Sequence, residues 1–231
     1  MRILALADEP DARLWSERCK EMLEGTDLIL SAGDLPSSYL SYLTCFTHAP
    51  ILYVRGNHDA SYAEKPPEGC TCVDGRVVNI NGVRVLGLGG SMRYRPSGCM
   101  YTEEEMRARI RGMGSQLRAM RGFDILLTHA PVKDLGDQPD LAHRGFACFA
   151  ELIRKYRPAV MFHGHVHQAY TASFVRIRDL DGVPVINACG SWFFDLPDDR
   201  EQQKPRWYAG ALEKKIGKKM ERASVGQRKQ L

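Results

Sequence analysis

Short, continuous apolar runs alternate along the chain with stretches in which apolar residues recur at helical spacing. Helices are predicted at 11–23, 37–47, 102–120 and 144–156. Strands are predicted where four or five apolar residues stand between polar or turn-forming neighbours, at 3–7, 28–32, 51–54, 125–128 and 159–163. Thr102 and Glu105 have the spacing of a capping box at the start of the third helix. This alternation predicts an α/β fold.

Two β-rich pairs of segments interrupt the alternation. They are 72–80 with 83–88, and 170–178 with 183–188. Asn81-Gly82 joins the first pair and is the dipeptide most typical of a two-residue hairpin turn. Asp181-Gly182 lies between the members of the second pair. The sequence therefore predicts α/β architecture with inserted hairpins rather than a pure βαβ repeat.

The basic character of the chain comes from its last segment. The sequence has 231 residues, is 44% hydrophobic and 26% charged, and carries a net charge of +4. Residues 209–231 hold seven lysines and arginines against two glutamates, so the rest of the chain is close to neutral. We expect one folded domain over 1–212 and a basic tail over 213–231 that is a frayed helix or disordered. A tail of this kind does not argue that the folded body binds nucleic acid.

The composition excludes a membrane span and a disulfide framework. The longest apolar runs fall far short of the roughly 20 residues that cross a bilayer, and Asp8 and Glu9 directly follow the first one, which rules against a signal peptide. The seven cysteines are an odd number without framework spacing, and Cys70 and Cys72 are separated by one residue rather than two. We expect reduced thiols, a cytoplasmic location and no membrane partner.

Side chains of the types that bind metals follow five of the predicted strands. They are Asp8, Asp34, Asn57 with His58 and Asp59, His129, and His165 with His167. Ligands gather beyond the carboxyl ends of strands in open α/β sheets, so these side chains are expected to converge. Oxygen ligands mixed with imidazoles suit Mn, Fe, Zn or Ni. They are too many for one ion, and a carboxylate shared by two ions about 3.5–4 Å apart is the arrangement that clamps a phosphate ester.

The motifs in this order resemble the calcineurin-like metallophosphoesterases. The similarity covers roughly residues 2–195, and the pair Gly56-Asn57-His58-Asp59 and Gly164-His165-Val166-His167 is specific. The resemblance implies a four-layer α-β-β-α sandwich that holds a dinuclear metal centre. It further implies that a metal-bound hydroxide attacks the phosphate ester.

The resemblance also implies a role for each matching residue. Asp34 would bridge the two ions. Asp8 and His167 would bind the first ion, and Asn57, His129 and His165 the second. His58 would protonate the leaving oxygen or stabilise its charge, and Asp59 would orient His58. The expected cofactors are two divalent transition-metal ions, with Mn or Fe preferred and Zn or Ni as alternatives.

The first motif departs from the family pattern. The family has Asp-x-His, whereas this chain has Asp8-Glu9-Pro10, so the first ion loses an imidazole. Water can fill the vacancy, Glu9 or Asp11 can reach in, or the first site is weak and the protein mostly mononuclear. Pro10 also suits the first turn of the helix that follows.

Arginines and a tyrosine supply a candidate substrate-binding loop. Arg93, Tyr94 and Arg95 follow a predicted strand and a glycine pair, and arginine binds phosphate or carboxylate bidentately; a solvated surface loop is the alternative. His48 and His143 are interpreted as ordinary core or surface residues. His163 is interpreted as a packing residue or one that supports a ligand.

The leading hypothesis is a metal-dependent phosphohydrolase that cleaves a phosphate mono- or diester of a small molecule or nucleotide. A nuclease or cyclic-nucleotide phosphodiesterase is the second hypothesis, and it would use the basic tail with Arg93 and Arg95. A metal-poor scaffold of the same fold that binds proteins is the third, and the missing imidazole at Pro10 favours it. The intact His58-Asp59 pair favours an enzyme. The sequence leaves the oligomeric state and any protein partner of the tail open.

Overall fold

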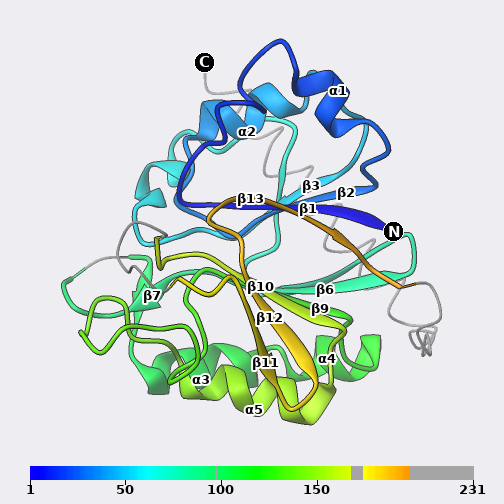
Figure 1. Ribbon diagram of the computed structural model, residues 1–231. Helices are drawn as coiled ribbons and strands as arrows, with labels where there is room; N and C mark the ends of the chain where they lie inside the picture. Colours follow the sequence, from blue (N-terminus) through cyan, green and yellow to red (C-terminus); the bar gives the residue numbers. More distant parts are fainter. Residues whose placement is uncertain (97, 168–173, 198–231) are drawn as a thin grey trace, which may run out of the picture.

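Two β-sheets lie face to face between two layers of helices in the computed structural model, which describes residues 1–96, 98–167 and 174–197 (Figure 1). Starting from the helices of the N-terminal half, the layers are helices, first sheet, second sheet and helices. The predicted four-layer α-β-β-α sandwich is thus confirmed. The tail 213–231 and the expected boundary at 212 lie outside the described residues.

The first sheet has five strands in the order β13-β1-β2-β3-β4. Their bounds are β1 (Arg2–Ala7), β2 (Leu28–Ser31), β3 (Ile51–Tyr53), β4 (Thr71–Cys72) and β13 (Gly190–Asp195). β1 to β4 run parallel, and β13 pairs with β1 antiparallel. The short helices α1 (Cys19–Leu23) and α2 (Ser37–Leu43) cover the outer face of this sheet.

The second sheet has six strands in the order β11-β12-β10-β9-β6-β5. Their bounds are β5 (Arg76–Ile80), β6 (Val83–Leu88), β9 (Ile125–Thr128), β10 (Val160–His163), β11 (Ile177–Leu180) and β12 (Val183–Asn187). The four central strands are parallel and the two edge strands antiparallel. The outer face carries α3 (Glu103–Gly112), α4 (Gly114–Met120) and α5 (Ala147–Tyr156). Three short elements complete the described chain: η1 (Asp59–Ala63), β7 (Ser91–Met92) and β8 (Met100–Tyr101).

Side chains alternate along the central strands between two cores. In β1, Ile3 and Ala5 point to the core between the sheets, whereas Leu4 and Leu6 pack under α1 and α2. Because strands covered on both faces bury every residue, they read as continuous apolar runs rather than alternating ones. This explains why the sequence predicts the five central strands within a residue or two of their observed bounds.

Two predicted helices differ from the structure. The segment 11–23 contributes only α1 at its end, because the Asp11 side chain accepts a hydrogen bond from the Arg13 backbone and the Ser16 hydroxyl donates to the Arg13 carbonyl. Such local bonds compete with helical ones. The predicted helix 102–120 breaks into α3 and α4 between two glycines, at Met113. Its capping box at Thr102 is present as predicted.

One predicted feature of the β-rich segments is confirmed, and three others differ from the prediction. The hairpin at Asn81-Gly82 forms as expected, with both residues at positive φ. The segment 72–80 is divided, since Cys72 pairs with β3 in the first sheet and Arg76–Ile80 belongs to the second. In the predicted strand 170–178 only Ile177 and Arg178 are in β11, and residues 170–173 lie outside the described part. Strand β13 was not predicted at all.

None of the helices in the described part of the chain is long and apolar enough to cross a membrane. All seven cysteines lie within the described residues, and none forms a disulfide, as the sequence predicts.

Candidate metal centre

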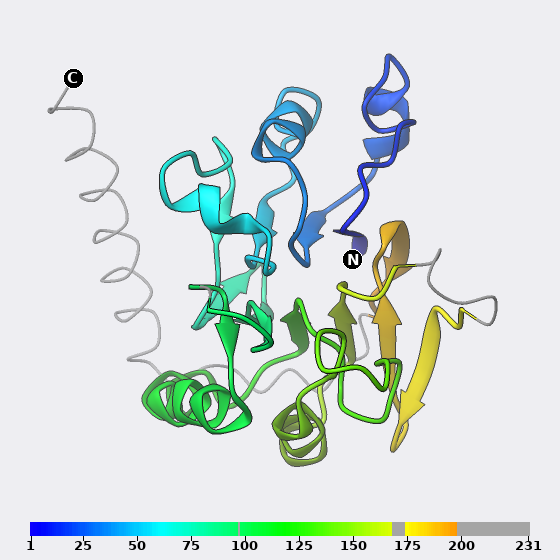
Figure 2. The same cartoon turned by 90° about the vertical axis from the view of Figure 1, so that its left-hand side faces the viewer.

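The loops that carry the predicted site residues meet where the parallel strands of both sheets end. Figure 2 looks onto this side of the molecule. The first sheet supplies the loops after β1, β2 and β3, and the second sheet supplies those after β9 and β10. The site therefore lies across the interface of the two sheets, as expected for ligands at strand ends.

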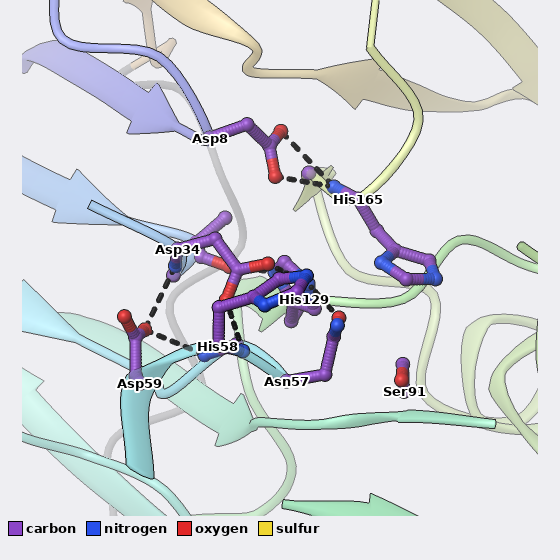
Figure 3. A network of polar contacts seen from close by, with 12 residues as sticks. Asp8, Asp34, Asn57, His58, Asp59, Ser91, His129 and His165 are labelled. Atoms are coloured by element: carbon purple, nitrogen blue, oxygen red, sulfur yellow. Dashed lines mark hydrogen bonds and ion pairs between the residues drawn. The ribbon is translucent and has the colours of Figure 1, made fainter. Parts of the chain in front are cut away.

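Asp34, Asn57 and His129 form the centre of the constellation (Figure 3). The His129 Nε2 atom lies 2.9 Å from Asn57 Oδ1 and 3.2 Å from Asp34 Oδ2. His129 is fully buried and Asn57 nearly so. Three residues from three strand ends, up to 95 positions apart in sequence, thus direct their polar atoms at one small volume.

Two imidazoles are oriented by backbone carbonyls. His129 Nδ1 donates to the carbonyl of Ala32 at 2.8 Å, and His165 Nε2 donates to that of Ala142 at 2.7 Å. The ring centroids lie 4.8 Å apart. These bonds leave His129 Nε2 and His165 Nδ1 to face the site. Hydrogen bonds at the second ring nitrogen are the usual means by which proteins fix ligating histidines.

Close backbone approach explains the glycines of the motifs. A Cβ on Gly56 would collide with the Asp34 carboxylate, and a Cβ on Gly33 would collide with the backbone at Gly56. Asp8, Asp34 and His165 all have positive φ, at 63°, 57° and 71°. Non-glycine residues held in this region often mark functional sites.

Burial and charge set the protonation of the central groups. Burial raises the pKa of Asp34, but the opposing charge of His129 outweighs it and the pKa falls to about 2. Burial would lower the pKa of His129, yet Asp34 and Asp8 raise it to about 9. Burial lowers the pKa of His165 to about 3. These pKa shifts favour a protonated imidazole at His129 and a neutral imidazole at His165.

Asp8 closes the site from β1. Both of its carboxylate oxygens accept from the His165 backbone N–H, at 2.9 and 3.0 Å (Figure 3). Burial raises its pKa to about 6. A single side chain therefore links the end of the first strand in one sheet to the loop after β10 in the other.

His58 and Asp59 lie next to Asp34 (Figure 3). The His58 backbone N–H donates to Asp34 Oδ1 at 2.8 Å, and its side chain is exposed. Asp59 Oδ2 accepts from the backbone N–H of Asp34 at 2.7 Å and of Gly56 at 2.8 Å. Within the described residues Asp59 makes no hydrogen bond to the His58 ring. Asp59 thus anchors two loops instead of orienting the imidazole.

His167 and the residues around Pro10 form a second group of ligand types. His167 Nδ1 lies 3.0 Å from Glu9 Oε1. Glu9, His167 and Cys189 each offer a ligand atom, and these atoms lie within 4.8 Å of one another. Asp11 turns elsewhere, since its carboxylate contacts Arg13 and the Ser191 hydroxyl. Cys189 was not singled out from the sequence as a site residue.

The predicted substrate-binding loop lies at the rim. Arg93, Tyr94 and Arg95, with Pro96 and Leu141, line an open groove of about 560 Å³. Arg93 forms an ion pair with Glu105 at 2.7 Å, and Arg95 lies over the Tyr94 ring. Leu141 precedes Ala142, whose carbonyl accepts from His165. The groove therefore adjoins the site through this loop.

His143 lies nearer the site than the sequence indicated. Its ring contacts that of His165 at a centroid distance of 5.3 Å, and its Nδ1 is 3.0 Å from Asp140. No strand end or motif marks it, because it lies in a long loop between β9 and α5. His48 is exposed and outside the site, and His163 is buried with its Nδ1 on the Gly164 carbonyl.

The residues fit a divalent transition metal. Ligand atoms of Asp34, His129 and His165 lie within 4.8 Å of one another. Carboxylate, amide oxygen and imidazole together make the mixed donor set that such ions prefer. His129 Nε2, at 2.9 Å from Asn57 Oδ1 and 3.2 Å from Asp34 Oδ2, marks the position that a cation would occupy. A metal would take the place of the His129 Nε2 proton.

Comparisons with known proteins agree with this geometry. A family model described as a calcineurin-like phosphoesterase superfamily domain matches residues 1–201. An uncharacterized protein of Haemophilus influenzae is 24% identical over 187 residues, which cover 67% of this chain and 80% of that protein.

Solved structures show the same fold. TT1561 of Thermus thermophilus superposes with a TM-score of 0.57 at 18% identity, covering 82% of this chain and 89% of that one. GAP50, the anchor in the inner membrane complex of Plasmodium, superposes with a TM-score of 0.51 at 12% identity, covering 82% and 71%. At these identities the likeness extends to the fold alone.

Proposed function

Because the chain belongs to the calcineurin-like phosphoesterase superfamily, we propose that it is a metal-dependent phosphohydrolase. Its substrate is a phosphate mono- or diester of a small molecule or nucleotide. One observation carries the proposal: Asp34, His129 and His165 direct ligand atoms to a common point across two sheets, with the exposed His58 beside them.

The chain's own residues divide into two ligand sets. Asn57, His129 and His165 would hold one ion, Asp8 and His167 the other, and Asp34 would serve both. When bound, divalent ions supply Lewis acidity toward a phosphoryl oxygen and activate water near neutral pH. The carbonyls of Ala32 and Ala142 keep the two buried imidazoles in the tautomer with a nitrogen facing the site.

His58 is the candidate proton donor to the leaving oxygen. Its backbone N–H on Asp34 Oδ1 fixes its position beside Asp34, while its exposed ring can meet a substrate that approaches from solvent. Histidine suits this task because its ordinary pKa lies near neutral pH.

The rim groove favours a small substrate. Tyr94 and Arg95 line a groove of about 560 Å³, a volume typical of small-molecule sites. Arg93 already pairs with Glu105, so it offers less charge to a nucleic acid than the sequence alone indicates. The nuclease alternative rests on the basic tail, which lies outside the described residues.

The test compares hydrolysis of an aryl phosphate monoester and an aryl phosphodiester by protein supplied with Mn²⁺. We expect turnover by the wild-type chain, its loss on addition of a chelator, and its loss in His129→Ala. His48→Ala is the matched control, because His48 is exposed and precedes β3, at the opposite end of that strand from Asn57, and it should retain full turnover. Equal turnover by His129→Ala and His48→Ala would contradict the proposal.

A protein-binding scaffold is the second candidate, and Pro10 is the observation that favours it. One protein of this fold, GAP50, is described as an anchor. A scaffold has no use for the buried ligand set around His129, and metal-free, inactive wild-type protein in the same assay would favour it.

A further inference from the structure

Next to Pro10, where the family's imidazole is missing, the structure brings together a second cluster of ligand-type side chains. Glu9 follows β1, His167 follows β10 and Cys189 follows β12, and their ligand atoms lie within 4.8 Å of one another. Asp8 directly precedes Glu9 and accepts from the His165 backbone N–H, two residues before His167, and Ala7 bridges to Cys189, so Asp8 lies near this cluster. Since Asp8 and His167 are the residues expected to bind the first ion, the cluster lies where that ion is expected.

The structure distinguishes between the two carboxylates that flank Pro10. Glu9 Oε1 lies 3.0 Å from His167 Nδ1. Asp11 is engaged by Arg13, with its Oδ2 at 2.7 Å from the guanidinium, and by the Ser191 hydroxyl. Glu9 is therefore the carboxylate available to the site, and Asp11 is a structural residue.

A buried amide holds Cys189 beside His167. Asn187 Oδ1 accepts from the Cys189 backbone N–H at 2.8 Å, and Asn187 Nδ2 donates to the carbonyl of Val166 at 2.8 Å. Asn187 is 3% exposed. Because Val166 directly precedes His167, one fixed side chain links the two loops. An isolated Ala7–Cys189 bridge ties the same loop to the end of β1, two residues before Glu9.

We propose that Glu9, His167 and Cys189 complete the first metal site, with the Cys189 thiolate in place of the missing imidazole. The inference rests on the proposed function, since it concerns the same metal centre. A thiolate makes this site softer than one built from oxygen and nitrogen alone, so it favours Zn²⁺, Fe²⁺ or Co²⁺ over Mn²⁺. The centre then holds two chemically different sites.

Cobalt spectroscopy tests the proposal without use of activity. Thiolate bound to Co²⁺ gives a charge-transfer band in the near ultraviolet that oxygen and nitrogen ligands do not give. We expect the wild-type chain to bind two Co²⁺ ions and to show this band. Cys189→Ser should lose the band, and Glu9→Gln should weaken binding of one ion by about tenfold or more, as loss of a ligand or of a carboxylate that orients one does.

Cys148→Ser is the control, because Cys148 is also buried but lies in α5 on the outer face of the second sheet. It should keep the band and both ions. Two bound ions without a thiolate band, or a band that survives in Cys189→Ser, would overturn the proposal. If the wild-type chain binds a single ion and His129→Ala loses it, the Cys189 proposal is also overturned. In that case the proposed function stands. If the wild-type chain binds no cobalt at all, both the thiolate site and the metal-dependent phosphohydrolase are contradicted.

Discussion

Single buried polar side chains hold the site together by contacting backbone rather than other side chains. Asp59 joins the loops after β2 and β3, and Asn187 joins the loops at Val166 and Cys189. Buried backbone groups need such partners. At this scale, ligand geometry depends on residues that do not themselves bind the ligand.

Asp59 provides a prediction about stability. In Asp59→Ala the backbone N–H groups of Asp34 and Gly56 lose their acceptor, which we expect to cost about 2–6 kcal/mol at about 1–3 kcal/mol for each buried donor. Asp59→Asn keeps an oxygen that both can use and should cost about 1 kcal/mol or less. Urea unfolding measures both variants. Equal stability of the alanine and asparagine variants would show that these two bonds do not hold the loops.

The site residues that the sequence predicts share one signal, and of the two that it missed only Cys189 carries it. Asp8, Asp34, Asn57, His129 and His165 each follow an apolar run directly or within a few residues, so strand ends reveal them. Cys189 also follows a strand, but a lone cysteine in an apolar context reads as packing. His143 lies in a loop whose path only the tertiary structure fixes.

Strands covered on both faces could be predicted from the sequence. The edge strand β13 and the helices that local bonds shorten or break could not. The central strands are continuous apolar runs. Strand β13, with the sequence Gly-Ser-Trp-Phe-Phe-Asp, lies at a sheet edge with partly buried residues, and its aromatics are equally consistent with loop packing. The break at Met113 and the short α1 follow from local glycines and side-chain-to-backbone bonds, which compete with helical periodicity.

The candidate ligands lie on both sheets. Asp8, Asp34 and Asn57 come from the first sheet, whereas His129, His165 and His167 come from the second. An ion bound between them would therefore link the two halves of the sandwich. Any ligand that binds the folded state alone raises global stability by mass action.

Metal should accordingly raise the melting temperature. At a free Mn²⁺ concentration about 100-fold above the dissociation constant, stability rises by about 2.7 kcal/mol, which is about 5–10 °C for a domain of this size. Chelator should reverse the shift, and His48→Ala should behave like the wild-type chain. A shift of the same size in His129→Ala would mean that the stabilising ion binds elsewhere.

His58→Ala tests the central claim most directly, because it separates metal binding from chemistry. The measurement pairs metal stoichiometry with turnover of an aryl phosphate ester for the wild-type chain and this variant. Since the His58 ring is exposed and its backbone N–H is what contacts Asp34, we expect unchanged metal content and turnover lower by about 10²- to 10⁴-fold. Unchanged turnover at unchanged metal content would contradict the proton-donor role, and a metal-loaded wild-type chain that hydrolyses neither ester would contradict the phosphohydrolase itself.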